Sequence, residues 1–248
     1  LAVGNVEAAL EGFRAAYHKY PMAPEFLYGL ALTHGQMGEI DRAARYAERA
    51  VDHGLPFSRF QAGPRRLVDP LRGHAVYQEL SRRHGAPLVH GPTVGSVTDT
   101  EARFWVRTWH PANLQIALHP VGHADAETRT DTVRSSPDRD YTAVAHATDL
   151  EPDTAYRYRV LLDGAQVAGP FRMRTFPPTG APARFEIGFG GCAGFTPWHE
   201  HVWRTIASYR FPTFLLTGDN VYIDNPEIPA AQQYCYYRRQ SRPEFREF

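Results

Sequence analysis

Alternation of apolar and polar residues is the feature that most restricts the fold of this chain, and it dominates residues 86–178. In its clearest stretch, every second position from Ala102 to Thr108 is apolar or threonine, with Arg or Trp between. A period of two is typical of a strand with one buried face. Similar stretches occur at 114–118, 141–146, 150–160 and 171–176, with a turn expected at Asp163-Gly164. Several short strands separated by turns predict a β-sandwich.

One of these stretches has a recognisable pattern. Residues 150–160 read Leu-Glu-Pro-Asp-Thr-Ala-Tyr-Arg-Tyr-Arg-Val, which places Tyr156, Tyr158 and Val160 on one face. The run resembles the corner and following strand of fibronectin type III-like domains. This resemblance implies a fibronectin type III-like β-sandwich over 86–178. Such domains seldom catalyse reactions, so no chemistry is expected from it.

A repeat with an offset of 34 residues precedes the strands. Gly4-Asn-Val-Glu7 matches Gly38-Glu-Ile-Asp41. The same offset relates two pairs of alanines: Ala9 with Ala43 and Ala16 with Ala50. Since 34 residues is the period of the tetratricopeptide repeat, we expect tetratricopeptide-like helices over 1–85, with a capping helix at 69–83. In this register the chain begins inside a repeat; a generic helical hairpin is the alternative.

Residues 183–248 change pattern again. Strands are predicted at 184–190 and 212–218, a helix at 199–209 between them, and further helix at 229–248. The second strand is almost entirely apolar, as in a parallel sheet buried on both faces. In a β-α-β unit the carboxyl ends of both strands lie at one edge, where open α/β sheets bind their ligands.

Two polar clusters follow these strand ends. Cys192 lies in Gly-Gly-Cys-Ala-Gly, and Asp219 and Tyr222 lie in Gly-Asp-Asn-Val-Tyr. Because both strand ends lie at one edge, we expect the three side chains to reach one metal site. Their chemistry suits such a site: a carboxylate can bridge two ions, a phenolate suits Fe(III) and a thiolate is a softer donor. Two bridged metals can activate a water for phosphoryl transfer. Each residue also has an ordinary alternative: a buried cysteine, a capping aspartate or a packing tyrosine.

The motif Gly218-Asp-Asn-Val-Tyr-Ile-Asp224 resembles the Gly-Asp-x-x-Tyr motif of PhoD-like phosphatases and of the related purple acid phosphatases. The purple enzymes carry Asp-x-Gly before it, whereas Cys192-Ala-Gly194 stands there in this chain. A cysteine at that place is typical of the PhoD-like branch. Residues 236–245, Tyr-Tyr-Arg-Arg-Gln-Ser-Arg-Pro-Glu-Phe, also resemble the stretch that follows in that branch. Those enzymes likewise have a β-sandwich before the catalytic domain.

The resemblance covers residues 86–248 and implies that 183–248 is the N-terminal part of an α/β metallophosphoesterase domain. It implies Fe(III) bound by Cys192, Asp219 and Tyr222, with Asp219 bridging to Ca²⁺, in an enzyme that hydrolyses phosphate monoesters or diesters. It also implies that the remaining ligands lie beyond Phe248, so this chain alone is expected to be inactive. The alternative is a non-enzymatic protein that binds a partner through its helical repeats and β-sandwich and carries a degenerate hydrolase domain.

Four other side chains of this segment are weaker candidates. Asp224 is either a further ligand or a solvated turn residue. His199 and His201 are two residues apart, whereas a helical zinc pair needs a spacing of four, so we interpret them as polar residues at a helix start. Cys235 lies in an aromatic stretch and is interpreted as structural; a disulfide with Cys192 is an open alternative.

Composition limits the expected partners. The chain has 27 basic and 27 acidic residues, and this balance gives no basis for binding nucleic acid or an acidic membrane surface. No apolar run reaches the roughly 18 residues of a membrane span. The expected partners are a phosphoester substrate and a protein bound by the helical repeats. The PhoD-like resemblance implies export to the bacterial periplasm or the cell exterior.

Overall fold

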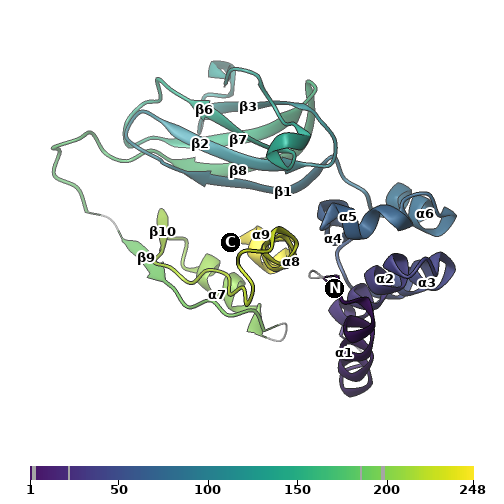
Figure 1. Cartoon of the computed structure of the whole chain (residues 1–248). Helices are drawn as coiled ribbons and strands as arrows, with labels where there is room; N and C mark the ends of the chain where they lie inside the picture. Colours follow the sequence, from purple (N-terminus) through teal and green to yellow (C-terminus); the bar gives the residue numbers. More distant parts are fainter. Residues whose placement is uncertain (2–3, 22, 185, 197–198) are drawn as a thin grey trace. The chain divides into compact units, whose positions relative to one another are not determined.

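The chain forms two compact units. The computed structural model describes residues 1, 4–21, 23–184, 186–196 and 199–248. One unit comprises Leu1–Gly85, Cys192–Trp203 and Asp219–Phe248, and the other comprises Ala86–Gly191 and Arg204–Gly218. The last segment of the sequence therefore contributes to both units (Figure 1). Among the described residues, no helix is both long and apolar enough to cross a membrane.

The first unit begins with a series of helices. In chain order they are α1 (Val6–Lys19), α2 (Pro24–Gln36), α3 (Ile40–Asp52), α4 (Ser58–Ala62), α5 (Arg65–Val68), the 3₁₀ turn η1 (Asp69–Leu71) and α6 (Ala75–His84). The starts of α1 and α3 are separated by the offset of 34 residues found in the sequence. The side chain of Asn5 caps α1 by accepting a hydrogen bond from the Ala8 amide at 3.0 Å.

Small residues allow α2 and α3 to pack closely. Ala43 and Ala50 on α3 are fully buried in one core with Leu27 and Tyr28 of α2. The corresponding alanines on α1, Ala9 and Ala16, are only half-buried and border a cavity described below. No described residue of α1 is fully buried, so α1 is more loosely packed than α3.

The capping helix is shorter than the sequence predicted. It begins at Ala75 instead of residue 69, because the segment around Pro70 forms the 3₁₀ turn η1. Leu71, Tyr77 and Leu80 are buried as expected, whereas Ala75 is exposed at the first position of α6.

The second unit contains an antiparallel β-sandwich. One sheet has the order β1-β2-β6, formed by β1 (Leu88–Gly95), β2 (Ala102–Thr108) and β6 (Thr142–Ala147). The other has the order β4-β3-β7-β8, formed by β4 (Thr128–Arg129), β3 (Asn113–Pro120), β7 (Ala155–Leu162) and β8 (Ala165–Arg174), with β5 (Val133–Arg134) also paired to β3. The two sheets face each other across a shared core (Figure 1). In this core the ring centroids of Phe104 and Tyr158 are 4.9 Å apart.

Several details of the sandwich confirm the sequence pattern. Asp163 and Gly164 both have positive φ (48° and 83°), as a two-residue hairpin turn between β7 and β8 requires. Tyr156, Tyr158 and Val160 are buried on one face. The hydroxyl oxygen of Tyr156 accepts a hydrogen bond from the Glu151 amide at 2.8 Å, which fixes the corner before β7.

Four strands of the sandwich differ from the prediction. The two-residue strands β4 and β5 and the longer β1 were not predicted, and β8 begins at Ala165, six residues before the predicted start at 171. In β1 and β8 a glycine–proline pair interrupts the alternation, Gly91-Pro92 in β1 and Gly169-Pro170 in β8. The pattern therefore reads as a turn although the backbone continues as a strand.

The last segment contains the expected parallel strand pair. β9 (Ile187–Gly190) and β10 (Thr213–Leu216) pair in parallel, with α7 (Val202–Ser208) between them in sequence. The prediction that the second strand is buried on both faces is wrong. Leu215 and Leu216 are 51% and 41% exposed, because β9 is the only strand paired with β10 among the described residues. α8 (Pro229–Gln240) and α9 (Pro243–Glu247) complete the chain.

Candidate metal centre

Two loops at the ends of parallel strands carry the candidate ligands. Gly190, the last residue of β9, pairs with Leu216, the last residue of β10. Cys192 follows two residues after the first strand end, and Asp219 follows three residues after the second. The position directly before Cys192 has room only for a glycine. A Cβ at Gly191 would lie 2.9 Å from Thr217 Oγ1 and 3.0 Å from the Gly218 carbonyl oxygen, both in the loop after β10.

The three predicted ligands lie together. The Tyr222 hydroxyl donates a hydrogen bond to Asp219 Oδ2 at 3.2 Å, and the Cys192 thiol lies 3.7 Å from the same oxygen. The Ala193 amide donates to the Asp219 carbonyl oxygen at 2.9 Å and joins the two loops. All three side chains are exposed. The arrangement gives three donor groups of different hardness on one open surface; their role as metal ligands stays a prediction.

Two of the three residues have an unusual backbone conformation. Cys192 has φ of 55° and Asp219 has φ of 49°, both in the left-handed region. Aspartate tolerates this region better than most residues, but cysteine has no such advantage, and the conformation costs about 1–2 kcal/mol. Residues held in such conformations cluster at functional sites, where the surrounding structure enforces them.

The environment of Tyr222 favours its protonated form. Its pKa is raised to about 12, mainly by the hydrogen bond with Cys192, then by desolvation and by the hydrogen bond and charge of Asp219. A phenol must lose its proton before it can bind a metal ion. An ion that binds here must therefore displace the proton that the two neighbouring groups help to hold.

The donor set fits part of an iron site. Phenolate and carboxylate are hard donors that suit Fe(III), and a thiolate can complete the softer side. Among the described residues there is no cluster of three or more His, Cys, Asp or Glu that could hold a metal; the set predicted from the sequence instead combines one Cys and one Asp with the phenol of Tyr222. In addition, the side-chain oxygen of Asn220, directly after Asp219, is buried and has no hydrogen-bond partner within the described part of the chain.

The sequence did not single out Asn220, Glu200 or Arg239, although all three belong to this site. Glu200 and Arg239 form a buried ion pair, with 3.0 Å between Glu200 Oε2 and Arg239 Nε. Arg239 also donates hydrogen bonds to carbonyl oxygens of both ligand loops. The only sequence feature that pointed to Arg239 was the resemblance of residues 236–245 to the PhoD-like branch, and this resemblance assigned the arginine no role.

The weaker candidates lie outside this group of contacts. Asp224 is exposed and borders the cavity described below. His199 and His201 precede α7, and their ring centroids are 6.5 Å apart. Cys235 is half-buried on α8, where burial raises the pKa of its thiol. Both cysteines are free, so the disulfide alternative is wrong.

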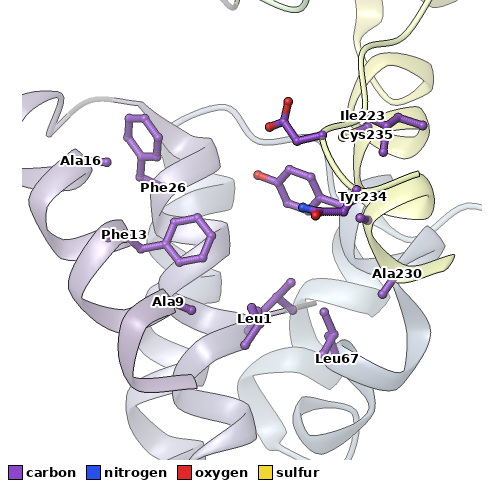
Figure 2. Close-up of a pocket in the computed structure, with 15 residues that line it drawn as sticks. Leu1, Ala9, Phe13, Ala16, Phe26, Leu67, Ile223, Ala230, Tyr234 and Cys235 are labelled. Carbon is purple, nitrogen blue, oxygen red and sulfur yellow. The ribbon is translucent and has the colours of Figure 1, made fainter. Parts of the chain in front are cut away.

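An apolar cavity lies on the helical side of the first unit. It has a volume of about 440 Å³ and is bordered by Phe13 of α1, Phe26 of α2 and Tyr234 of α8 (Figure 2). The loop after Tyr222 supplies another wall through Ile223 and Asp224. The cavity is thus separate from the Cys192–Asp219–Tyr222 contacts, although the same loop runs from one to the other.

Comparison with known proteins places the fold. Residues 85–180 match the model of a domain of unknown function, DUF7800, and this match coincides with the β-sandwich. No curated protein matches the sequence. A solved structure of PhoD is similar to this chain with a TM-score of 0.54 and 14% identity, covering 62% of this chain and 35% of that one. The matched part of this chain therefore has a fold similar to that of PhoD, and the match spans about a third of the length of that structure.

Smaller matches concern parts of the chain. A sensor domain of the anti-sigma factor RsgI4 from Pseudobacteroides cellulosolvens has a TM-score of 0.30 and 17% identity, over 37% of this chain and 97% of that one. A human contactin 1 fn3 domain has a TM-score of 0.26 and 20% identity, over 37% and 79%. None of these matches supports the tetratricopeptide assignment of the helices, which stays a prediction.

Proposed function

We propose that this chain is part of a metal-dependent phosphoesterase that hydrolyses phosphate monoesters or diesters. The observation that carries the proposal is the convergence of Cys192, Asp219 and Tyr222 on a chain with a PhoD-like fold. The β9–α7–β10 segment belongs, in this proposal, to an α/β metallophosphoesterase domain. The β-sandwich before it resembles the fibronectin type III-like domain of PhoD-like enzymes.

Each of the three residues has a proposed role. Cys192 and Tyr222 would each hold an Fe(III) ion through one side-chain atom, and the Asp219 carboxylate would serve both that ion and a Ca²⁺ ion. Two such ions would supply a water activated for attack and a positive clamp on the phosphoryl group. The protein contributes the orientation of its donors: the hydrogen bond from Tyr222 and the contact from Cys192 already converge on one Asp219 oxygen.

A phosphatase assay tests the proposal. The protein as its gene encodes it, supplied with iron and calcium, is expected to hydrolyse p-nitrophenyl phosphate or its bis-ester, and the preferred substrate identifies the ester class. Asp219→Asn should lower kcat at least about 100-fold, because a lost ligand affects the metal site more than the 10- to 100-fold effect of an outer partner. Glu227→Gln is the matched control: it removes an exposed carboxylate from the same loop, one with no proposed role in the site, and should change kcat less than about threefold.

The rival function is partner binding through the helices, with a degenerate hydrolase domain as scaffold. In that case neither of these two variants alters phosphoesterase activity or iron content. Absence of phosphoesterase activity in the wild type, together with absence of bound iron, would contradict the enzymatic proposal and favour the rival.

A further inference from the structure

We propose that Arg239 is the positioning residue of this site: it holds the two ligand loops at the separation that Cys192 and Asp219 need to share one ion. The expected effect of Arg239 on metal affinity rests on the proposed function. The fixing of the two loops by Arg239 does not, and it can be measured without any metal.

The hydrogen bonds of Arg239 are distributed over both loops. Nη2 donates to the Ala193 carbonyl oxygen at 2.9 Å, and Nη1 donates to the Asn220 carbonyl oxygen at 3.3 Å. Ala193 directly follows Cys192, and Asn220 directly follows Asp219. One guanidinium therefore binds the backbone immediately after each of the two residues that have left-handed conformations. Since both carbonyls are bound by one planar group, the loops cannot separate without breaking one of these bonds.

The arginine is itself held in place. Its side chain is only 4% exposed and pairs with Glu200, whose side chain is 3% exposed. Trp203 donates an indole N–H to Glu200 Oε2 at 3.2 Å, and the Trp203 ring lies 5.0 Å from the guanidinium carbon. A buried, paired side chain with few alternative rotamers can fix the distance between two loops, whereas a solvated one would follow their motion.

The chemistry of this position requires an arginine. A guanidinium offers several N–H donors in one plane, so it can bind two carbonyls and a carboxylate at once. A lysine ammonium is a point charge on a flexible stem. It could retain the ion pair with Glu200 but would not reproduce the fork to Ala193 and Asn220.

The test compares Arg239→Gln and Arg239→Lys with the wild type. Arg238→Gln is the matched control, because Arg238 is the adjacent arginine on α8 and lies over the Phe195 ring at 4.0 Å, but neither carbonyl is among its contacts in the described residues. The first readout is amide hydrogen exchange at Ala193, whose N–H bonds the Asp219 carbonyl. The second readout is the dissociation constant for Fe(III), measured from the visible absorption of iron-bound phenolate.

We expect faster exchange at Ala193 in both Arg239 variants, relative to amides of α2, and no change in Arg238→Gln. Iron affinity should fall about 10- to 100-fold in Arg239→Gln, less in Arg239→Lys, and less than about twofold in the control. Unchanged exchange and unchanged affinity in a folded Arg239→Gln protein would overturn the proposal.

The two ways of failing are distinguishable. If the wild type binds no iron, the proposed function fails, and the exchange rate at Ala193 alone decides whether Arg239 positions the loops. If Arg239→Gln does not fold, Glu200→Gln takes its place, since it weakens the support of Arg239 and leaves the guanidinium present. Unchanged exchange at Ala193 in that variant and in Arg239→Lys would then overturn the proposal.

Discussion

At the scale of single residues, the backbone at Cys192 and Asp219 is the feature most in need of a cause. Both residues have positive φ, and neither is a glycine. For cysteine such a conformation costs about 1–2 kcal/mol, so without a functional requirement glycine or asparagine would be expected at position 192. Aspartate tolerates the conformation better, as Asp163 does in the β7–β8 turn. The proposed metal site supplies that requirement, because it needs a thiol and a carboxylate at these positions.

The pKa of Tyr222 gives a prediction about pH. Because the phenol keeps its proton up to a pH of about 12, iron that binds to it at neutral pH must release that proton. Binding should therefore strengthen as pH rises, by about tenfold per pH unit for this one proton. In Tyr222→Phe the slope of log affinity against pH should decrease by about one, which titrations against a competing chelator would measure. The control is Tyr236→Phe, which changes an exposed tyrosine of α8 and should keep the wild-type slope. If the slope is also unchanged in Tyr222→Phe, the Tyr222 phenol is not a ligand.

At the scale of elements, the two edge strands β1 and β8 of the sandwich share a local irregularity. β1 shifts register against β2 near Gly91, and β8 shifts register against β7 near Gly169. Both glycines have positive φ, 86° and 97°. A Cβ at Gly91 would lie 2.7 Å from the Trp105 carbonyl oxygen, so the neighbouring strand approaches too closely for any side chain. Such bulges at sheet edges disfavour pairing with the edge of another molecule.

Two glycines of β1 give a matched pair of variants. Gly91→Ala should destabilise the protein by about 2 kcal/mol or more, since it combines a left-handed alanine with a clash against β2. Gly95→Ala should change the free energy of unfolding by less than about 0.5 kcal/mol, because nothing lies within 4 Å of its Cβ. Urea unfolding followed by tryptophan fluorescence measures both, and equal effects would show that the bulge is not constrained as described.

The elements also show what the sequence could predict. β2 was found to within one residue of its observed bounds, Ala102–Thr108, because its period of two is uninterrupted and one face is buried. β1 was missed because Gly91-Pro92 imitates a turn. The three site residues could be proposed together because they follow strand ends. Arg239 could not, because its partners lie 46 and 19 residues away and are backbone carbonyls, which leave no pattern in the sequence.

At the scale of the whole molecule, the first unit joins the beginning and end of the chain. Arg59 of α4 is fully buried, forms two hydrogen bonds with Glu25 of α2 at 3.2 and 3.1 Å, and lies over the rings of Tyr28 and Tyr234. The Tyr234 hydroxyl of α8 donates to the same carboxylate at 3.4 Å. Since α8 also carries Arg239, which binds both loops of the candidate ligands, the helical region and these loops contact the same helix.

This buried ion pair gives a stability prediction. Glu25→Gln leaves the Arg59 charge buried without its counter-charge, and the free energy of unfolding should fall by about 3 kcal/mol. The control is Glu79→Gln, which breaks an exposed pair with Arg82 on α6 and should have no measurable effect. Denaturant titrations measure both, and a Glu25→Gln protein as stable as the control would contradict the role given to Arg59.

We propose that Cys192, Asp219 and Tyr222 together hold one iron ion. The decisive test is the iron content of the purified protein after exposure to Fe(III) and removal of excess metal, together with its visible absorption spectrum. We expect bound iron with an absorption band from iron-bound phenolate. We also expect loss of the band in Tyr222→Phe and loss of the iron in Asp219→Asn and Cys192→Ala. Iron retained equally by the wild type and all three variants, or by none of them, would contradict this proposal.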